Sequence, residues 1–244
     1  MDYGIIVDLE TTGINPEKDE IIEVGIVSFK VEENKTPTVV EIYGALSEPT
    51  IQIPPEIIKI TGIDNAHVKG ERVDWNKVKL LFNKASIAIA HNAVFDVGFL
   101  SKKKELSNCD IHWACSMRHI EWKRHGFSTR ALNYLAADHG FVNPFAHRAV
   151  FDCALTLRLI TPYFEELVKN SYENEYEIVA NKAPYSSKDD LKLNGYFWDS
   201  SERVWKKNTY ESSLDEERDF LSKTVYKNQP CHQENRLNRI SLMK

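Results

Sequence analysis

The stretch IIVDLETTG, residues 5–13, carries two acids at the end of an apolar, β-branched run. A run such as Ile5–Val7 is typical of a strand that is buried on both faces. Because side chains two residues apart on a strand point to the same side, Asp8 and Glu10 would share one side of it. Carboxylates so close repel each other, and the repulsion raises the pKa of one of them unless a cation intervenes. The stretch therefore predicts a central buried strand that ends at a charged site.

The segments that follow this strand predict a sheet covered by helices. Apolar patterns at 21–29 and 39–45 indicate two more strands, which would form an antiparallel meander with the first. A short apolar strand is predicted at 86–90. Helical patterns are found beyond residue 54, at 75–84, 91–100, 132–139 and 150–168. This alternation favours an α/β or α+β fold in which helices pack over one sheet.

Two further acids lie in apolar segments. Asp96 stands in HNAVFDVGFL, residues 91–100, and Asp152 stands in HRAVFDC, residues 147–153. A carboxylate in such surroundings must face a cleft, a partner or a metal, because burying an unpaired charge is costly. Carboxylates are hard oxygen ligands that suit Mg²⁺ or Mn²⁺, and the lack of a Cys/His ligand set in the sequence disfavours zinc. Converging carboxylates can hold two ions about 4 Å apart, a geometry used for in-line attack on a phosphodiester.

His147 precedes Asp152 by five residues, a spacing that does not stack two side chains on one helix. Five residues turn a helix by about 500°, so the two side chains would differ in direction by about 140°. We therefore expect His147 on the loop after Asn143 and Pro144, leaning over the acids. A histidine held there suits a general base that can move. Taken singly, each of these residues could be an ordinary capping or ion-paired residue, but together they predict a catalytic site.

The composition limits the class of protein. The chain has 244 residues, of which 42% are hydrophobic and 27% are charged, a balance typical of globular proteins. We expect no membrane span, no signal peptide and no membrane partner. The four cysteines lack paired spacing, which indicates thiols in a reducing compartment and predicts a cytoplasmic protein. The formal net charge of −5 argues against a large nonspecific phosphate-binding surface, but not against an enzyme that takes one strand end.

Three segments, taken in order, resemble the motifs of a known family. VDLETTG (residues 7–13), HNAVFDVGFL and HRAVFDC resemble the motifs of the DEDDh 3′–5′ exonucleases, the DnaQ-like group that includes polymerase proofreading subunits and exonuclease X. The resemblance covers about residues 2–165 and includes the intervening segments ITGIDNAHV and WACSM. The spacing of His147 and Asp152 is that of the histidine subclass. One departure is Thr61, which stands where many relatives carry a histidine.

The resemblance implies a ribonuclease H-like fold, which is an α/β fold with a mixed five-stranded sheet flanked by helices. It implies that two Mg²⁺ or Mn²⁺ ions are held by Asp8, Glu10, Asp96 and Asp152. It also implies that His147 is the base that deprotonates the attacking water. The implied reaction is hydrolysis of phosphodiester bonds from single-stranded or frayed 3′ ends of DNA, with release of nucleoside 5′-monophosphates, in DNA repair or turnover.

The resemblance also implies which residues meet the substrate. The backbone near Thr12 and Gly13 would meet the terminal 3′-hydroxyl, and Ile14 would lie against the last base. His91 and Phe95 are further candidates for substrate contact, although core or capping residues would have the same pattern.

A change of composition near Asn170 predicts a domain boundary. We expect an exonuclease domain over residues 1–170 and a small α+β accessory module over residues 171–244. The segment GYFWDSSERVW, residues 195–205, contains aromatic residues that could stack on the bases of a single strand. A small module needs most of its aromatic residues for its own core, so we expect only one or two of them to be exposed.

Other functions are compatible with parts of this pattern. An RNA 3′–5′ exonuclease of the same family is one alternative, because the predicted site need not contact a 2′-hydroxyl. A polymerase proofreading subunit is another, although the sequence identifies no segment that would attach a polymerase. A catalytically idle nucleic-acid-binding module is disfavoured by the complete set of acids and the histidine. The sequence identifies no protein partner.

Overall fold

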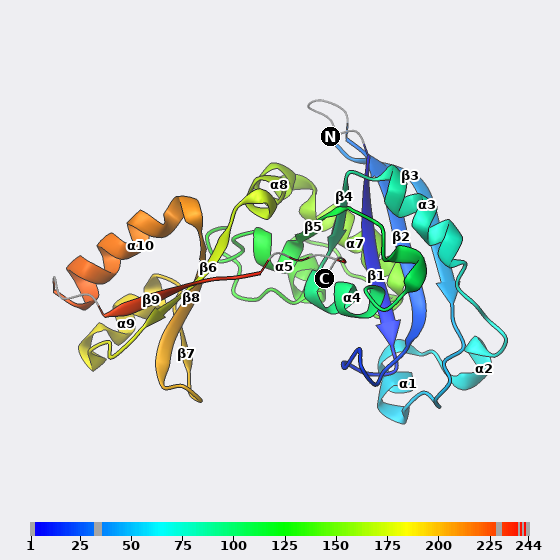
Figure 1. The fold of residues 1–244 in the computed structure, drawn as a ribbon, viewed down its shortest axis with the longest axis horizontal. Coiled ribbons are helices and arrows are strands. Elements are labelled where there is room, and N and C mark those ends of the chain that lie inside the picture. Colours follow the sequence, from blue (N-terminus) through cyan, green and yellow to red (C-terminus); the bar gives the residue numbers. More distant parts are fainter. Residues whose placement is uncertain (1–2, 32–35, 228–230, 239, 241, 243–244) are drawn as a thin grey trace. The chain divides into compact units, whose positions relative to one another are not determined.

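Two β-sheets organise the chain, one in each of two structural units (Figure 1). The computed structural model describes residues 3–31, 36–227, 231–238, 240 and 242. The first unit contains the described residues up to Ser171 together with Ile240 and Leu242, and the second unit lies between them in the sequence. No helix in these described ranges is both long and apolar enough to span a bilayer.

The sheet of the first unit has five strands in the order β3-β2-β1-β4-β5. The strands are β1 (Gly4–Thr11), β2 (Ile21–Lys30), β3 (Thr38–Leu46), β4 (Ile87–Ala90) and β5 (His112–Cys115). The first three form an antiparallel meander, and β4 and β5 continue the sheet in parallel from β1. The mixed five-stranded sheet and the meander confirm the fold class predicted from the sequence.

Helices flank this sheet, and one of them differs from the prediction. They are α1 (Pro55–Thr61), α2 (Asn65–Val68), α3 (Trp75–Lys84), α4 (Ala93–Leu100), α5 (Ser116–His119), α6 (Leu132–Asp138), α7 (Ala149–Ile160) and α8 (Phe164–Tyr172). A single helix was predicted over residues 150–168, and this was wrong, because a 3₁₀ turn at Thr161–Tyr163 separates α7 from α8. Pro162 in this turn lacks the N–H that a continuous α-helix requires.

Alternate residues of β1 face two different cores. Ile5 and Val7 belong to the core formed with α3 and α4, whereas Ile6 belongs to the core formed with α7. Asp8 and Glu10 have the same parity as Ile6 along the strand, so they lie on the side of α7. The sheet thereby directs both acids toward the helix that carries Asp152.

Two glycines allow α7 to lie close to the sheet. A Cβ at Gly25 of β2 would lie 2.3 Å from the carbonyl carbon of Ala149, and one at Gly44 of β3 would lie 2.6 Å from Cγ2 of Val150. Any larger residue at Gly25 would meet the backbone of the first turn of α7, which cannot move aside as a side chain can. The glycines therefore set the distance between the N-terminus of α7 and the acids of β1.

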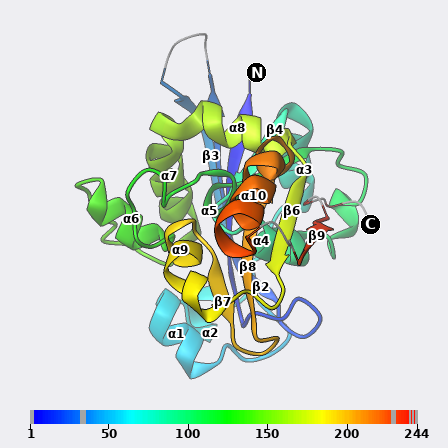
Figure 2. The same cartoon turned by 90° about the vertical axis from the view of Figure 1, so that its left-hand side faces the viewer.

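The second unit has a four-stranded antiparallel sheet in the order β7-β8-β6-β9 (Figures 1 and 2). Its elements are β6 (Glu175–Ala180), α9 (Lys188–Leu193), β7 (Phe197–Asp199), β8 (Val204–Tyr210), α10 (Leu214–Phe220) and β9 (His232–Arg236). Its core joins the two helices to one face of the sheet and contains Ile178, Leu191, Tyr196, Trp205 and Leu214. Phe197 and Trp198 remain about half exposed, so the structure separates core aromatics from exposed ones.

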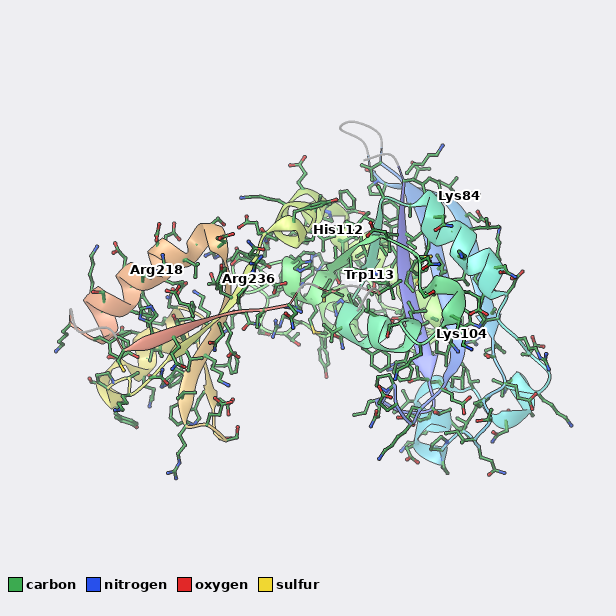
Figure 3. The ribbon with its side chains drawn as sticks, in the orientation of Figure 1. Lys84, Lys104, His112, Trp113, Arg218 and Arg236 are labelled. Atoms are coloured by element: carbon green, nitrogen blue, oxygen red, sulfur yellow. The ribbon has the colours of Figure 1, made fainter. Side chains whose placement is uncertain are left out.

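The strand β9 was not predicted from the sequence. Its residues, HQENR, are all polar and lack the apolar alternation by which a strand is recognised. Polar contacts of Arg218 and Arg236, two side chains labelled in Figure 3, hold this edge strand instead. Arg218 of α10 donates hydrogen bonds of 2.8 and 2.7 Å to both carboxylate oxygens of Glu234, and Arg236 donates one of 2.6 Å to Asn174.

Candidate active site

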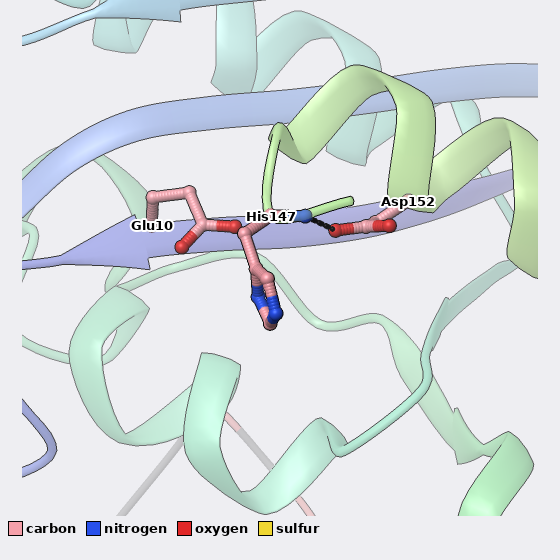
Figure 4. Close-up of side chains that lie close together, drawn as sticks. All are labelled: Glu10, His147 and Asp152. Carbon is pink, nitrogen blue, oxygen red and sulfur yellow. Dashed lines mark hydrogen bonds between the residues drawn. The ribbon is translucent and has the colours of Figure 1, made fainter. Parts of the chain in front are cut away.

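Glu10, His147 and Asp152 come together where β1 ends and α7 begins (Figure 4). One carboxylate oxygen or ring nitrogen from each of these residues lies within 4.8 Å of those from the other two. Glu10 belongs to the last residues of β1, and Asp152 lies in the first turn of α7. His147 lies in the turn that leads into α7, with its side chain exposed, at the loop position that its spacing predicted.

Both oxygens of Asp152 are oriented by the turn that precedes its helix. The side-chain amide of Asn143 donates to Oδ1 over 2.6 Å, and the backbone N–H of His147 donates to Oδ2 over 2.8 Å. His147 has a φ of +61°, in the left-handed region that residues other than glycine rarely adopt. The hydrogen bond to Asp152 helps to hold this backbone, so the acid and the histidine are fixed relative to each other.

Asp8 and Asp96 add two acids to this part of the molecule. Asp96, in the first turn of α4, is 3% exposed, and its Oδ1 has no hydrogen-bond partner among the described residues. Burial raises the pKa of Asp96 to about 8, although backbone N–H groups lower it in part. Burial also raises the pKa of Asp8 well above its usual range, and the charge of Asp96 raises it further.

Glu10 shows the same electrostatic effect. Burial raises the pKa of Glu10 to about 8, and the charges of Asp152 and Glu23 add to this increase. Burial raises the pKa of Asp152 as well, although the N–H of His147 opposes the shift. The repulsion between carboxylates that the sequence predicted is therefore present in the structure. Oxygen donors that repel one another, one of them buried without a hydrogen-bond partner among the residues that the structure describes, suit a divalent cation.

Glu23 is a fifth acid in this region, and the sequence reasoning missed it. It lies opposite Glu10 on β2, is 5% exposed, and accepts hydrogen bonds of 3.0 to 3.3 Å from the guanidinium of Arg148. It also accepts one of 2.9 Å from the N–H of Ala149, the first residue of α7. Glu23 therefore anchors the start of α7 to β2. Its signal in the sequence was a lone acid in the apolar strand IIEVGIVSF.

The predicted substrate residues at the end of β1 differ in exposure. Thr12 is 2% exposed, and its hydroxyl accepts a hydrogen bond of 2.9 Å from the N–H of Glu20. A Cβ at Gly13 would lie 2.5 Å from the carboxylate of Asp19, so a larger residue does not fit there without a shift. Ile14 is 86% exposed. Of the three, Ile14 presents its side chain most fully to solvent.

His91 and Phe95 are held by contacts within the protein. The two ring nitrogens of His91 lie 2.7 Å from Oγ of Ser116 and 2.7 Å from the carbonyl oxygen of Arg130. Burial lowers the pKa of His91 to about 4, so the ring is neutral near pH 7. Phe95 is partly buried, and its ring centroid lies 5.0 Å from that of Phe99. The contacts of His91 are those of a structural residue.

Comparison with known families and curated proteins gives consistent matches. The model of the exonuclease family RNase_T matches residues 5–160. A PolC-type DNA polymerase III of Clostridium perfringens is 29% identical over 198 residues, which are 78% of this chain and 13% of that protein. The 3′–5′ exonuclease DinG of Staphylococcus saprophyticus is 32% identical over 168 residues, which are 66% of this chain and 18% of that protein. The chain thus spans less than a fifth of the length of these curated relatives.

Solved structures share the fold at low sequence identity. Exonuclease X in complex with 5′-overhanging duplex DNA has a TM-score of 0.50 and is 22% identical, with 69% of this chain and 99% of that chain covered. The E. coli ExoI–ssDNA complex has a TM-score of 0.54 and is 16% identical, with 70% of this chain and 41% of that chain covered. These likenesses confirm the ribonuclease H-like fold that the sequence motifs implied.

Proposed function

The chain belongs to the RNase_T exonuclease family, and from this premise we propose that it is a metal-dependent 3′–5′ exonuclease that acts on DNA. It would hydrolyse the phosphodiester bond nearest the 3′ end and release nucleoside 5′-monophosphates. The observation that carries the proposal is the convergence of Glu10, His147 and Asp152, with Asp8 and the buried Asp96 adding two acids to the same region.

Two Mg²⁺ or Mn²⁺ ions would be held by the four acids Asp8, Glu10, Asp96 and Asp152. Oδ1 of Asp96, which has no hydrogen-bond partner in the described ranges, and the raised pKa values of Asp8 and Glu10 support this assignment, because a cation would favour the charged form of each acid. When bound, such ions supply charge stabilisation to the attacked phosphate and lower the pKa of the attacking water.

The protein residues around the acids would position the water and take up its proton. His147 is exposed in its turn and lies beside the carboxylates, so its ring can accept a proton from the water and pass it to solvent. Asn143 and the N–H of His147 keep Asp152 in one orientation. The contacts of Glu23 with Arg148 and Ala149 keep the start of α7 next to β1. They thereby also keep His147 and Asp152 there.

We propose DNA as the substrate by analogy with similar proteins. The curated relatives include a DNA polymerase, and two of the solved structures with this fold are complexes with DNA. The exposed Ile14, at the end of β1, would lie against the last base of the strand. DNA repair or turnover is the role in which we place this activity.

A nuclease assay with matched DNA and RNA oligonucleotides tests the proposal. Each oligonucleotide carries a label at its 3′ or its 5′ end and is incubated with Mg²⁺ or with EDTA. We expect 3′-labelled DNA to release labelled mononucleotide at once, and 5′-labelled DNA to shorten progressively, only with Mg²⁺. Undiminished cleavage in EDTA, or equal digestion of circular single strands, would contradict the proposal. Faster cleavage of RNA would replace DNA by RNA as the substrate.

A further inference from the structure

Two exposed phenylalanine rings lie together next to the candidate site. Phe145 is 54% exposed and Phe151 is 46% exposed. Their ring centroids are 4.6 Å apart and their planes are inclined by 39°. Aromatic side chains contribute most to stability when they are buried, so a pair left about half in solvent indicates a contact surface.

The pair is tied directly to the residues of the site. Phe145 lies in the turn that carries His147, two residues before it, and Phe151 directly precedes Asp152 in α7. Asn143 accepts a hydrogen bond of 3.0 Å from the N–H of Phe145, while its amide donates to Oδ1 of Asp152. Asn143 therefore links the backbone of Phe145 to the carboxylate of Asp152.

The pair does not belong to the hydrophobic cores of the first unit. The core beneath α7 contains Cys153 and Leu157 of that helix, and Phe141 and Phe127 pack against it from neighbouring segments. Phe145 is separated from Phe141 by four positions in the chain, but its ring contacts that of Phe151 instead. Two large apolar side chains thus remain partly exposed at the edge of the site.

We propose that Phe145 and Phe151 form a stacking surface for a base of the substrate strand upstream of the scissile phosphate. The inference rests on the function proposed above. Ile14 follows β1 and is the residue placed against the last base, whereas the two rings come from α7 and its leading turn and so meet the strand through a different segment. Every base has an aromatic face, so this surface would grip the strand without selecting its sequence.

Steady-state kinetics on single strands with one abasic position test the inference. The abasic position is moved over the first nucleotides upstream of the 3′ terminus, and each substrate is measured with wild type and with the double variant Phe145→Leu, Phe151→Leu. Leucine keeps apolar volume in the turn and removes the rings, so the variant should remain folded. We expect the variant to raise KM for the intact strand by about 5- to 150-fold, the range expected for one lost base stack.

The effects of the abasic position and of the double leucine variant on KM should not add. At one upstream position the abasic site should raise KM for wild type but have little further effect on the variant, because both changes remove the same contact. A single variant, Phe151→Trp, should keep KM within a few-fold of wild type. Leu80→Ala is the matched control, because Leu80 is 57% exposed on α3, which packs on the opposite face of the sheet.

The outcomes separate this inference from the proposed function. Cleavage by wild type with the same KM for intact strands and for every abasic strand overturns the stacking surface and leaves the exonuclease assignment intact. Equal sensitivity of wild type and the leucine variant to each abasic site also overturns it, since the rings would then only support the turn. Absence of cleavage by wild type of every oligonucleotide overturns the proposed function and this inference with it.

Discussion

Asp96 has a carboxylate oxygen that is buried and has no hydrogen-bond partner in the described part of the chain. Burial raises its pKa to about 8, so the charged form of this acid is disfavoured in the metal-free protein. Burial is also the main cause that raises the pKa of Glu10 to about 8. The protein alone therefore does not stabilise the charges of these residues, and a bound cation would do so.

Substitution of Asp8 tests this electrostatic arrangement. Asp8→Ala removes one of the proposed ligands, so we expect nearly complete loss of nuclease activity and loss of the increase in Tm that Mg²⁺ gives wild type. In EDTA the variant should melt at or above the temperature of wild type, because one repelling carboxylate has been removed. Thermal melts with and without Mg²⁺ give both results. A variant that gains as much from Mg²⁺ as wild type would place the metal elsewhere.

Substitution of His147 separates proton transfer from metal binding. His147→Ala should lower kcat by about 10²–10⁴-fold, the usual range for a lost general base, and should keep the increase in Tm with Mg²⁺. A ring nitrogen of His147 lies within 4.8 Å of carboxylate oxygens of Glu10 and Asp152, so the three residues could share an ion and this second measurement is needed. If the variant loses the stabilisation by Mg²⁺, His147 is a ligand rather than the base.

Sequence reasoning singled out the acids and the histidine as candidates for this site, and it missed the residues that hold them in place. Asp96 and Asp152 could be identified because acids are rare in apolar helices. Asn143 and Glu23 could not, because a polar residue in a loop or a single acid in a strand has many ordinary roles. Their function follows from hydrogen bonds to Asp152 and to the start of α7, and these contacts exist only after the chain has folded.

The contact between β2 and α7 determines the geometry of the site at the level of secondary structure. Gly25 lets the first turn of the helix reach the sheet, and Glu23 bonds to Arg148 and to the first N–H of the helix. We expect Glu23→Ala to lower the free energy of unfolding by about 1–3 kcal/mol, because it leaves the buried N–H of Ala149 without its acceptor and removes the partner of Arg148. Chemical denaturation measures this change.

A surface ion pair on the same sheet provides the control for Glu23. Glu41 of β3 pairs with Lys77 of α3, and the two side chains are 30% and 39% exposed. Glu41→Ala should change stability by no more than about 1 kcal/mol. Glu23→Ala should also lower kcat, since the turn with His147 ends and the helix with Asp152 begins at this anchor. Equal stabilities of the two variants would show that Glu23 has no special role.

The elements that were predicted correctly have regular apolar patterns. Those that were not depend on a proline or on polar contacts between residues distant in sequence. The meander β1–β3 and the helix α3 follow from apolar alternation and periodicity. The break between α7 and α8 arises at Pro162, within a segment whose apolar pattern continues on both sides. The strand β9 is polar and depends on pairing with β6 and on Arg218, which are distant in sequence.

The acids of the site also act together on the stability of the whole first unit. Raised pKa values mean that the folded protein binds protons more tightly than the unfolded chain, in which these acids titrate near pH 4. Between about pH 4 and pH 8 the folded state therefore holds more protons, so the free energy of unfolding falls as the pH rises. In EDTA we expect a higher Tm at about pH 5.5 than at about pH 8.5.

Mg²⁺ and an isosteric variant are the controls for this dependence on pH. Mg²⁺ should raise the Tm most at the higher pH, where the acids are charged. Asp96→Asn should make the Tm in EDTA less dependent on pH, because one of the titrating groups is removed. A Tm in EDTA that rises with pH over this range would contradict the electrostatic account of the site.

The last part of the chain returns to the first unit after the second unit is complete. Leu242 is 5% exposed and belongs to the core that contains Leu106 and Trp113, and Ile240 packs against the same core. The first unit is therefore not composed only of residues before the expected boundary near Asn170. A protein truncated after Ser171 would lack a side chain of its own core.

We expect the protein truncated after Ser171 to fold, but with a lower Tm than the full chain. Leu242→Ala in the full chain should cause most of the same destabilisation, because both changes empty the same place in the core. We expect it to lower the free energy of unfolding by about 2–5 kcal/mol. All the proposed catalytic residues lie before Ser171, so the truncated protein should still cleave short single strands in Mg²⁺ with a kcat close to that of the full chain. Melts of the three proteins, with kcat and KM on one short oligonucleotide, make the comparison. A truncated protein that folds and is stabilised by Mg²⁺ but does not cleave at saturation would show that the second unit contributes to the active site.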